Sequence, residues 1–139
     1  MNQHLPQLTQ LCEHHEVAIL YVFGSRADEV YHWLHNPLSV LSPGPADVDM
    51  SVYLPSETRW TIGQKVAFAQ ALEDLLGVNQ VDLGVLNEAE PFFAADVVRG
   101  NRLYTRDEHE ADEYDLYILR RAGDLAPFKR QQMESIFQT

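Results

Sequence analysis

The chain has 139 residues, 45% of them hydrophobic, which is enough for one domain with a substantial core. Its 21 acidic residues outnumber 10 lysines and arginines and give a formal net charge of −11. This balance argues against a protein that binds duplex nucleic acid or an anionic membrane through basic side chains. It suits a basic protein partner, or it serves solubility alone.

The sequence also indicates where the protein works. Its single cysteine, Cys12, excludes an internal disulfide framework and fits a reducing compartment. No stretch approaches the length of an apolar membrane span, and the N-terminus lacks the charged-then-apolar pattern of a signal peptide. We therefore expect a cytoplasmic protein.

Apolar periodicity and turn residues predict helices and strands that alternate along the chain. A first helix is expected over residues 4–15, and the strand Val17–Phe23 runs from there into Gly24-Ser25. A long connection over residues 26–46 could begin as a helix over 26–35, which Asn36-Pro37 should stop before a loop at 42–45. After this connection we expect a strand at 47–52, a helix at 60–76 closed by Gly77, and a strand at 80–86. A helix from about 87 to 100 and a strand at 102–105 should follow. The last helix is expected at 108–121, and Pro127 should break the tail into a second helical piece at 128–137.

Strands separated by helices in this way predict an α+β fold, with a small mixed sheet flanked by helices in a single domain of residues 1–139. The 26–46 connection is unusually apolar for a connector. Its apolar side chains either pack onto the domain's own core or form a partner surface or a wall of the active-site pocket. These side chains are Tyr31, Trp33, Leu34, Leu38, Val40 and Leu41.

Two acids, Asp47 and Asp49, alternate with apolar residues in the second expected strand. Alternation places both carboxylates on one face, about 7 Å apart along the backbone. Such a pair is electrostatically costly unless something positive lies between the two groups. A solvated strand face is the simplest interpretation, but Gly24-Ser25 precedes the pair and Asp82 follows at a strand position. This combination favours a divalent-metal site.

The Gly24-Ser25 turn has a chemistry of its own. Glycine permits a backbone conformation and a close approach that other residues resist. A serine that follows it at the beginning of a helix can offer its N–H and its hydroxyl to a phosphate. Taken alone, the Gly-Ser pair is weak evidence for a phosphate-binding site, since Gly-Ser after a strand is usually just a turn.

Taken in order, Gly24-Ser25, Asp47-x-Asp49 and Asp82 resemble the nucleotidyltransferase superfamily that includes DNA polymerase β. The closest likeness is to the minimal nucleotidyltransferase (MNT) antitoxins of HEPN–MNT toxin–antitoxin pairs. The resemblance spans residues 15–106, with 81–87, Pro91 and 99–104 looking like the second half of that small domain, and it leaves 108–139 as a helical tail. It implies a polymerase β-like nucleotidyltransferase fold.

The resemblance also implies roles for these residues. Gly24 and Ser25 would hold the triphosphate of ATP. Asp47 and Asp49 would hold Mg²⁺, as two ions, and Asp82 would complete the metal-binding, catalytic triad near the attacking hydroxyl. The family usually continues Gly-Ser-x-Ala-Arg-Gly, whereas this chain has Arg26-Ala27-Asp28-Glu29 and a longer connection to the acid pair. Asp28 thus stands where the family has arginine, and Arg26 is the residue that could replace it in binding phosphate.

Nucleotidyl transfer gives independent reasons for these residue types. Two Mg²⁺ ions about 4 Å apart stabilise both the attacking and the leaving oxygen, and Mg²⁺ prefers carboxylate oxygens. Positioning and electrostatics dominate phosphoryl chemistry, so a small domain can suffice.

The resemblance implies a type VII-like antitoxin, an Mg-dependent protein adenylyltransferase that moves AMP from ATP to a tyrosine hydroxyl of a HEPN ribonuclease toxin. Two alternatives remain open. The protein could be an antitoxin that acts by binding alone, its acids being vestigial. It could also be a small-molecule nucleotidyltransferase of the aminoglycoside-modifying kind, although those proteins generally carry a substantial second domain.

Overall fold

The computed structural model of the protein describes residues 3–36, 38–42 and 46–137, and within these ranges four strands form one sheet. The sheet order is β3-β2-β1-β4. β1 is antiparallel to both β2 and β4, whereas β2 and β3 run parallel. The prediction of an α+β fold with a small mixed sheet is confirmed. The strands are β1 (Ile19–Phe23), β2 (Val48–Tyr53), β3 (Val81–Val85) and β4 (Asn101–Thr105).

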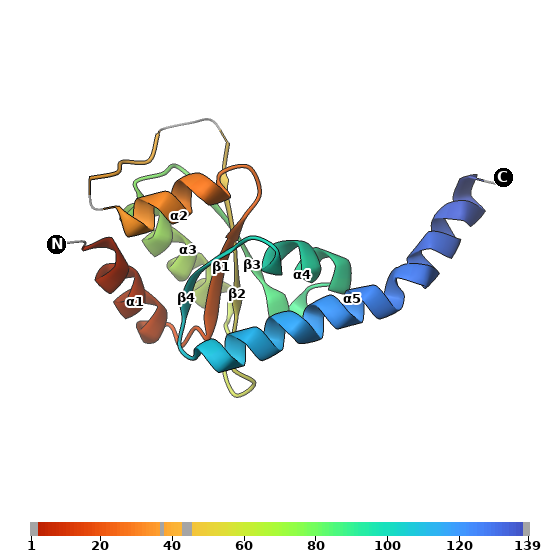
Figure 1. Cartoon of the computed structure of the whole chain (residues 1–139). Helices are drawn as coiled ribbons and strands as arrows, with labels where there is room; N and C mark the ends of the chain where they lie inside the picture. The colour runs from red at the N-terminus through yellow and green to blue at the C-terminus, as the bar shows by residue number, and fades with distance from the viewer. Residues whose placement is uncertain (1–2, 37, 43–45, 138–139) are drawn as a thin grey trace.

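Helices cover both faces of this sheet (Figure 1). Strand alternation explains the two layers, because Val48, Met50 and Val52 of β2 point into one core while Ile19 and Tyr21 of β1 point into the other. None of the described helices is long and apolar enough to cross a membrane. The first core is covered by α1 (His4–His14), α2 (Ala27–His35) and α3 (Ile62–Leu76), and the second by α4 (Pro91–Val98), which the 3₁₀ turn η1 (Leu86–Glu88) precedes, and by α5 (Glu108–Phe137).

The third helix shows how local sequence sets the limits of an element. Thr61 and Gln64 form a capping box, in which the Thr61 hydroxyl accepts from the Gln64 N–H at 3.1 Å and the Gln64 side chain accepts from the Thr61 N–H at 2.7 Å. The helix therefore begins at Ile62, slightly after the expected Trp60. It ends at Gly77, which adopts the left-handed conformation with φ +72°.

The expected break at Pro127 is wrong. α5 runs as one helix from Glu108 to Phe137 with Pro127 inside it. Proline removes one backbone donor and crowds the preceding turn, which kinks a helix more often than it ends one when flanking residues favour helix. Figure 1 shows the ribbon of α5 changing direction in its second half, where the helix leaves the domain.

The apolar connection of residues 26–46 packs mainly onto the domain's own core. Trp33, Leu34 and Leu41 are buried, with exposed fractions of 4%, 0% and 6%. The interpretation of Trp33 and Leu34 as a partner surface is therefore wrong, because α2 turns these side chains inward. Leu38 and Val40 stay exposed. The expected stop at Pro37 and most of the expected loop at 42–45 lie outside the described residues.

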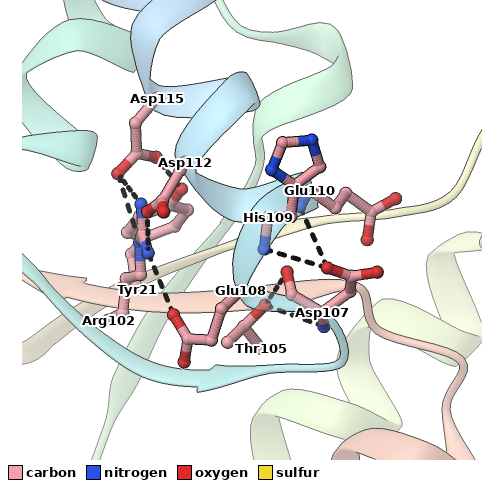
Figure 2. A network of polar contacts seen from close by, with 9 residues as sticks. All are labelled: Tyr21, Arg102, Thr105, Asp107, Glu108, His109, Glu110, Asp112 and Asp115. Carbon is pink, nitrogen blue, oxygen red and sulfur yellow. Dashed lines mark hydrogen bonds and ion pairs between the residues drawn. The ribbon is translucent and has the colours of Figure 1, made fainter.

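A polar network fastens α5 to the sheet (Figure 2). The Arg102 guanidinium on β4 donates to Asp115 of α5 at 3.2 and 2.6 Å, and Tyr21 on β1 donates its hydroxyl to the same carboxylate. Arg102 also forms ion pairs with Glu108 at 3.3 Å and Asp112 at 2.8 Å. Burial and the bond to Asp115 raise the pKa of Tyr21 well above its usual range, so the phenol stays protonated and donates.

We expect the individual contacts of this network to contribute unequally to the free energy of unfolding. Asp115→Ala should lower the free energy of unfolding by about 2–3 kcal/mol, because it leaves a buried phenol and a half-buried guanidinium without their shared acceptor. Asp112→Ala is the matched control in the same helix, and it should cost less than about 1 kcal/mol because the Asp112 carboxylate is exposed. Urea denaturation of both variants gives the comparison, and equal losses would show that Asp115 has no special role.

Candidate active site

The three predicted acids gather at one end of the sheet. Asp49 in β2 lies opposite Asp82 in the parallel strand β3 and opposite Phe23 in the antiparallel strand β1. Asp47 directly precedes β2, and alternation places it on the same face as Asp49. Asp49 is half-buried, whereas Asp47 and Asp82 are exposed. The sheet register thus brings together residues that are far apart in sequence.

The acids sense one another electrostatically. The pKa of the Asp49 carboxyl is raised above its ordinary value, first by burial and then by the negative charges of Asp82 and Asp47. Among the described residues, no group of three or more His, Cys, Asp or Glu side chains is placed so that it could hold a metal ion. The donor set nevertheless fits Mg²⁺ chemically, because carboxylate oxygens are its preferred protein ligands and substrate phosphates complete its coordination. Metal binding by Asp47, Asp49 and Asp82 stays a prediction.

Gly24 lies directly against this acid group. Its φ of +78° turns the chain from β1 towards α2, and a Cβ built on it would lie 2.5 Å from Asp49 Oδ2. Only glycine satisfies both requirements. Ser25 follows in the turn, exposed, just before α2 begins at Ala27. Backbone N–H groups at a helix beginning attract phosphate, so triphosphate binding at Gly24 and Ser25 remains our prediction.

Arg26 has a different environment from the one that phosphate binding needs. Its side chain is 7% exposed, and its guanidinium donates to the carbonyl oxygens of Ser42 at 2.6 Å and Ala46 at 3.2 Å. It also forms an ion pair with Glu29 at 3.0 Å, and Glu29 accepts in turn from Ser42. The bond from Arg26, followed by the one from the Ser42 backbone, lowers the pKa of Glu29 to about 2. Arg26 therefore closes the 26–46 connection, and these contacts do not support its predicted role as a phosphate ligand.

Asp28, which stands where the family has arginine, also has a hydrogen-bond partner in the structure. Asn101, the first residue of β4, donates its side-chain amide to Asp28 Oδ1 at 3.3 Å. β4 can begin this close to β1 because of Gly100, where a Cβ would lie 2.4 Å from the carbonyl oxygen of Val22. The start of α2 and the start of β4 are thus joined beside the Gly24 turn. No sequence pattern indicates the bond between Asn101 and Asp28, since the two residues are distant in the chain.

Sequence reasoning also missed Ser51. It lies two residues beyond Asp49 on the same strand face, is fully buried, and its Oγ has no hydrogen-bond partner among the described residues. It pairs in register with Gly84, where a Cβ would lie 2.9 Å from the Ser51 Oγ. The glycine on β3 therefore makes room for the hydroxyl. The sequence contained a signal for Ser51. It continues the alternation of Asp47 and Asp49 along one strand, and Asp82 and Gly84 alternate in the same way along the next strand.

Substitution of Gly24 separates its backbone role from its contact with Asp49. Gly24→Ala should lower the free energy of unfolding by about 1 kcal/mol through backbone strain and should also abolish Mg²⁺-dependent ATP binding, because the new methyl group displaces the Asp49 carboxylate. Gly77→Ala is the matched control, since it has nearly the same φ but no atom within 4 Å of the added Cβ. Calorimetric titration with ATP and Mg²⁺ should show normal binding for Gly77→Ala, and loss in both variants would refute the role of the contact.

The raised pKa of Asp49, which burial and then the neighbouring charges cause, predicts that removing this carboxylate stabilises the fold at neutral pH. Because its pKa is higher in the folded than in the unfolded protein, its ionisation destabilises the fold as pH rises through that raised value. Without metal, Asp49→Asn should therefore be more stable than wild type at neutral pH and equally stable near pH 3, where both side chains are uncharged. Urea denaturation in EDTA measures this, with Asp74→Asn on the exposed face of α3 as the control. A destabilised Asp49→Asn at neutral pH would contradict the argument.

Comparison with known proteins agrees with the fold. The polymerase beta nucleotidyltransferase family model matches residues 6–109, well over half of the chain. No curated protein sequence matches this chain. A toxin–antitoxin crystal structure with AMP-PNP is 16% identical with a TM-score of 0.71, covering 96% of this chain and 98% of that one.

Two further structures are similar over nearly the whole length. One is a tri-AMPylated Shewanella oneidensis HEPN toxin in complex with MNT antitoxin, 17% identical with a TM-score of 0.68, and the other is the toxin–antitoxin MntA–HepT, 15% identical with a TM-score of 0.68. Each match covers 99% of both chains. At these identities the likeness shows the fold, and the family match shows the lineage. The predicted nucleotidyltransferase domain is thus confirmed: the chain belongs to the polymerase beta nucleotidyltransferase family.

Proposed function

We propose that this protein is the antitoxin of a HEPN–MNT toxin–antitoxin pair and acts as an Mg-dependent protein adenylyltransferase. It would move AMP from ATP to a tyrosine hydroxyl of the HEPN ribonuclease toxin. The observation that carries the proposal is the pairing of Asp49 with Asp82 across β2 and β3, directly beside the Gly24 turn. We take the single domain of residues 1–139, with a core over 15–106, as the functional unit.

The reaction is an in-line displacement. The tyrosine oxygen forms a bond to the α-phosphorus of ATP while the bond from that phosphorus to the bridging oxygen breaks, so pyrophosphate leaves with the electron pair. The hydroxyl proton passes to a carboxylate of the acid group or to water. Mg²⁺ held by Asp47, Asp49 and Asp82 would neutralise the charge that develops on the phosphate oxygens.

The chain's own groups would position the reactants. The backbone at Gly24 and Ser25 would hold the triphosphate at the beginning of α2. Asp82 is exposed at the start of β3, where an acceptor hydroxyl can reach it. Asp49 is held between these two elements by the sheet register. Such positioning is the main contribution that a protein makes to phosphoryl chemistry.

Support for the partner comes from the similar structures. Those proteins are described as toxin–antitoxin complexes, one with AMP-PNP and one with an AMPylated HEPN toxin. The net charge of −11 suits a partner with a basic surface. A single cysteine, which excludes an internal disulfide, fits the cytoplasm, where we propose that the pair acts.

One observation favours the alternative of an antitoxin that acts by binding alone. Asp28 replaces the family's arginine, and Arg26 is already engaged by Glu29 and two backbone carbonyls. The Gly24 turn therefore lacks the guanidinium that usually supports phosphate on that side. In this alternative the acids would be remnants and the toxin would be silenced only while it stays covered.

A double variant distinguishes the two antitoxin mechanisms. Asp47→Asn with Asp49→Asn keeps side-chain size but removes metal-binding charge, so transfer of AMP to the toxin should fall by at least about a hundredfold. Binding to the toxin through surfaces outside the site should change little. The measurement is incorporation of labelled AMP from ATP, in the presence of Mg²⁺, into the HEPN toxin that we propose as the partner. The two proteins are then separated and the toxin's ribonuclease activity is assayed.

Wild-type protein should leave the toxin silent after separation, because a covalent mark persists, whereas toxin freed from the double variant should recover. The control is Asp74→Asn with Glu134→Gln, which removes two carboxylates from exposed helix surfaces and should behave like wild type. Durable silencing by the Asp47/Asp49 variant would refute the enzymatic proposal and leave the binding mechanism.

A further inference from the structure

The two edges of the sheet are treated differently. At the β3 edge, the backbone N–H of Val81, the first residue of the strand, donates to the Glu73 carboxylate of α3 at 2.9 Å, so α3 satisfies the beginning of that edge. β4 lies at the other edge and, among the described residues, pairs with β1 alone. In an antiparallel pair, alternate residues direct their N–H and C=O groups away from the partner strand. β4 thus offers backbone donors and acceptors along an open side.

A cleft of about 930 Å³ runs along this open side. We call it the β4-edge cleft. Figure 1 shows β4 at the outer side of the sheet between α1 and the beginning of α5. None of the six predicted active-site residues, Gly24, Ser25, Arg26, Asp47, Asp49 and Asp82, lines it. Its walls include residues 102–105 of β4 with the following Arg106, Leu5 of α1, Tyr31 of α2 and Glu108 of α5. Leu5 and Tyr31 are 41% and 44% exposed.

The charges in the cleft are mainly negative. Glu13, Glu16 and Glu57 line it, and none of the three makes an ion pair with another described residue. Its two arginines are neutralised locally, since Arg102 binds three acids at the beginning of α5 and Arg106 binds Glu110 at 2.7 Å. A ligand in the cleft therefore meets carboxylates without ion-pair partners at Glu13 and Glu16, and at Glu57, which interacts with Arg106 only beyond ion-pair distance. These carboxylates favour a cationic ligand.

We propose that the β4-edge cleft binds an extended basic segment of a partner protein, which adds to β4 as a fifth strand. Main-chain hydrogen bonds to β4 provide affinity, and alternate side chains of the segment provide specificity. Apolar side chains of the segment pack on Leu5 and Tyr31. Its lysines or arginines face Glu13, Glu16 and Glu57. This surface is separate from the proposed catalytic site and does not depend on it.

A synthetic peptide tests the proposal. The probe is an acetylated, amidated peptide of alternating lysine and valine, about seven residues long, which matches a typical strand. A second peptide of the same sequence carries N-methyl groups on alternate amides, so it keeps the charge but loses the donors on one edge. We expect the first peptide to bind, to slow hydrogen exchange of amides within residues 101–105, and to bind more tightly than the second by at least about tenfold.

Charge reversal of acids in the β4-edge cleft is the second test of the proposal. Glu13→Lys with Glu57→Lys should weaken binding of the first peptide by about tenfold, the effect of two lost exposed ion pairs. Asp74→Lys with Glu88→Lys changes the net charge equally on exposed positions outside the cleft and should have little effect. Equal binding of both peptides, equal weakening by both double variants, or no binding at all would overturn the proposal.

Discussion

The close approach of Gly24 to Asp49 is the constraint on which the arrangement of the site depends. β1 is central in the sheet, so its last residue fixes where the chain turns towards α2. The turn needs a positive φ at Gly24, and the Asp49 carboxylate occupies the space where a side chain would stand. The expected phosphate-binding turn and the acid pair are therefore placed by the same backbone contact. A site built on paired strands in this way is held more rigidly than one built on loops.

This geometry concentrates negative charge without local compensation. Asp49 is half-buried near two other carboxylates, and its pKa is raised first by burial and then by the repulsion from Asp82 and Asp47. The nearest predicted cation, Arg26, is turned inward to close the 26–46 connection. A fold selected for stability alone would avoid such a group, and local conflicts of this kind concentrate at functional sites. A bound cation would relieve this conflict, which is why it supports the catalytic proposal over vestigial acids.

The sequence predicted the features that depend on local pattern. Acid–apolar alternation at 47–50 correctly indicated which residues of β2 share a face, and glycine correctly indicated the end of α3 at Gly77. Features that depend on distant partners could not be predicted. The ion pairs of Arg102, the closure of the connection by Arg26 and the bond from Asn101 to Asp28 all join segments whose proximity only the sheet order decides.

One open alternative and one error have specific physical explanations. The sequence left open whether Trp33 and Leu34 pack onto the core or face a partner. They pack inward because α2 is amphipathic and the connection is tied down behind it at Ser42 and Ala46. Pro127 looked like a break because proline lacks a donor, but a helix can bend around one missing hydrogen bond when it is long and its first half is fastened to the sheet.

The attachment of β4 to the rest of the domain affects its open edge. One side of the strand is bonded to β1, with a register shift between the Leu20–Tyr104 and Tyr21–Arg102 pairs, and Arg102 ties the strand to α5 through three carboxylates, so β4 is anchored on two sides where its outer backbone groups face the cleft. A rigid open edge is an aggregation liability, and proteins usually cap or shorten it, as Glu73 does for β3. A rigid edge also loses little entropy when another strand adds to it. The difference between the two edges of the same small sheet is therefore best explained by a partner segment for β4.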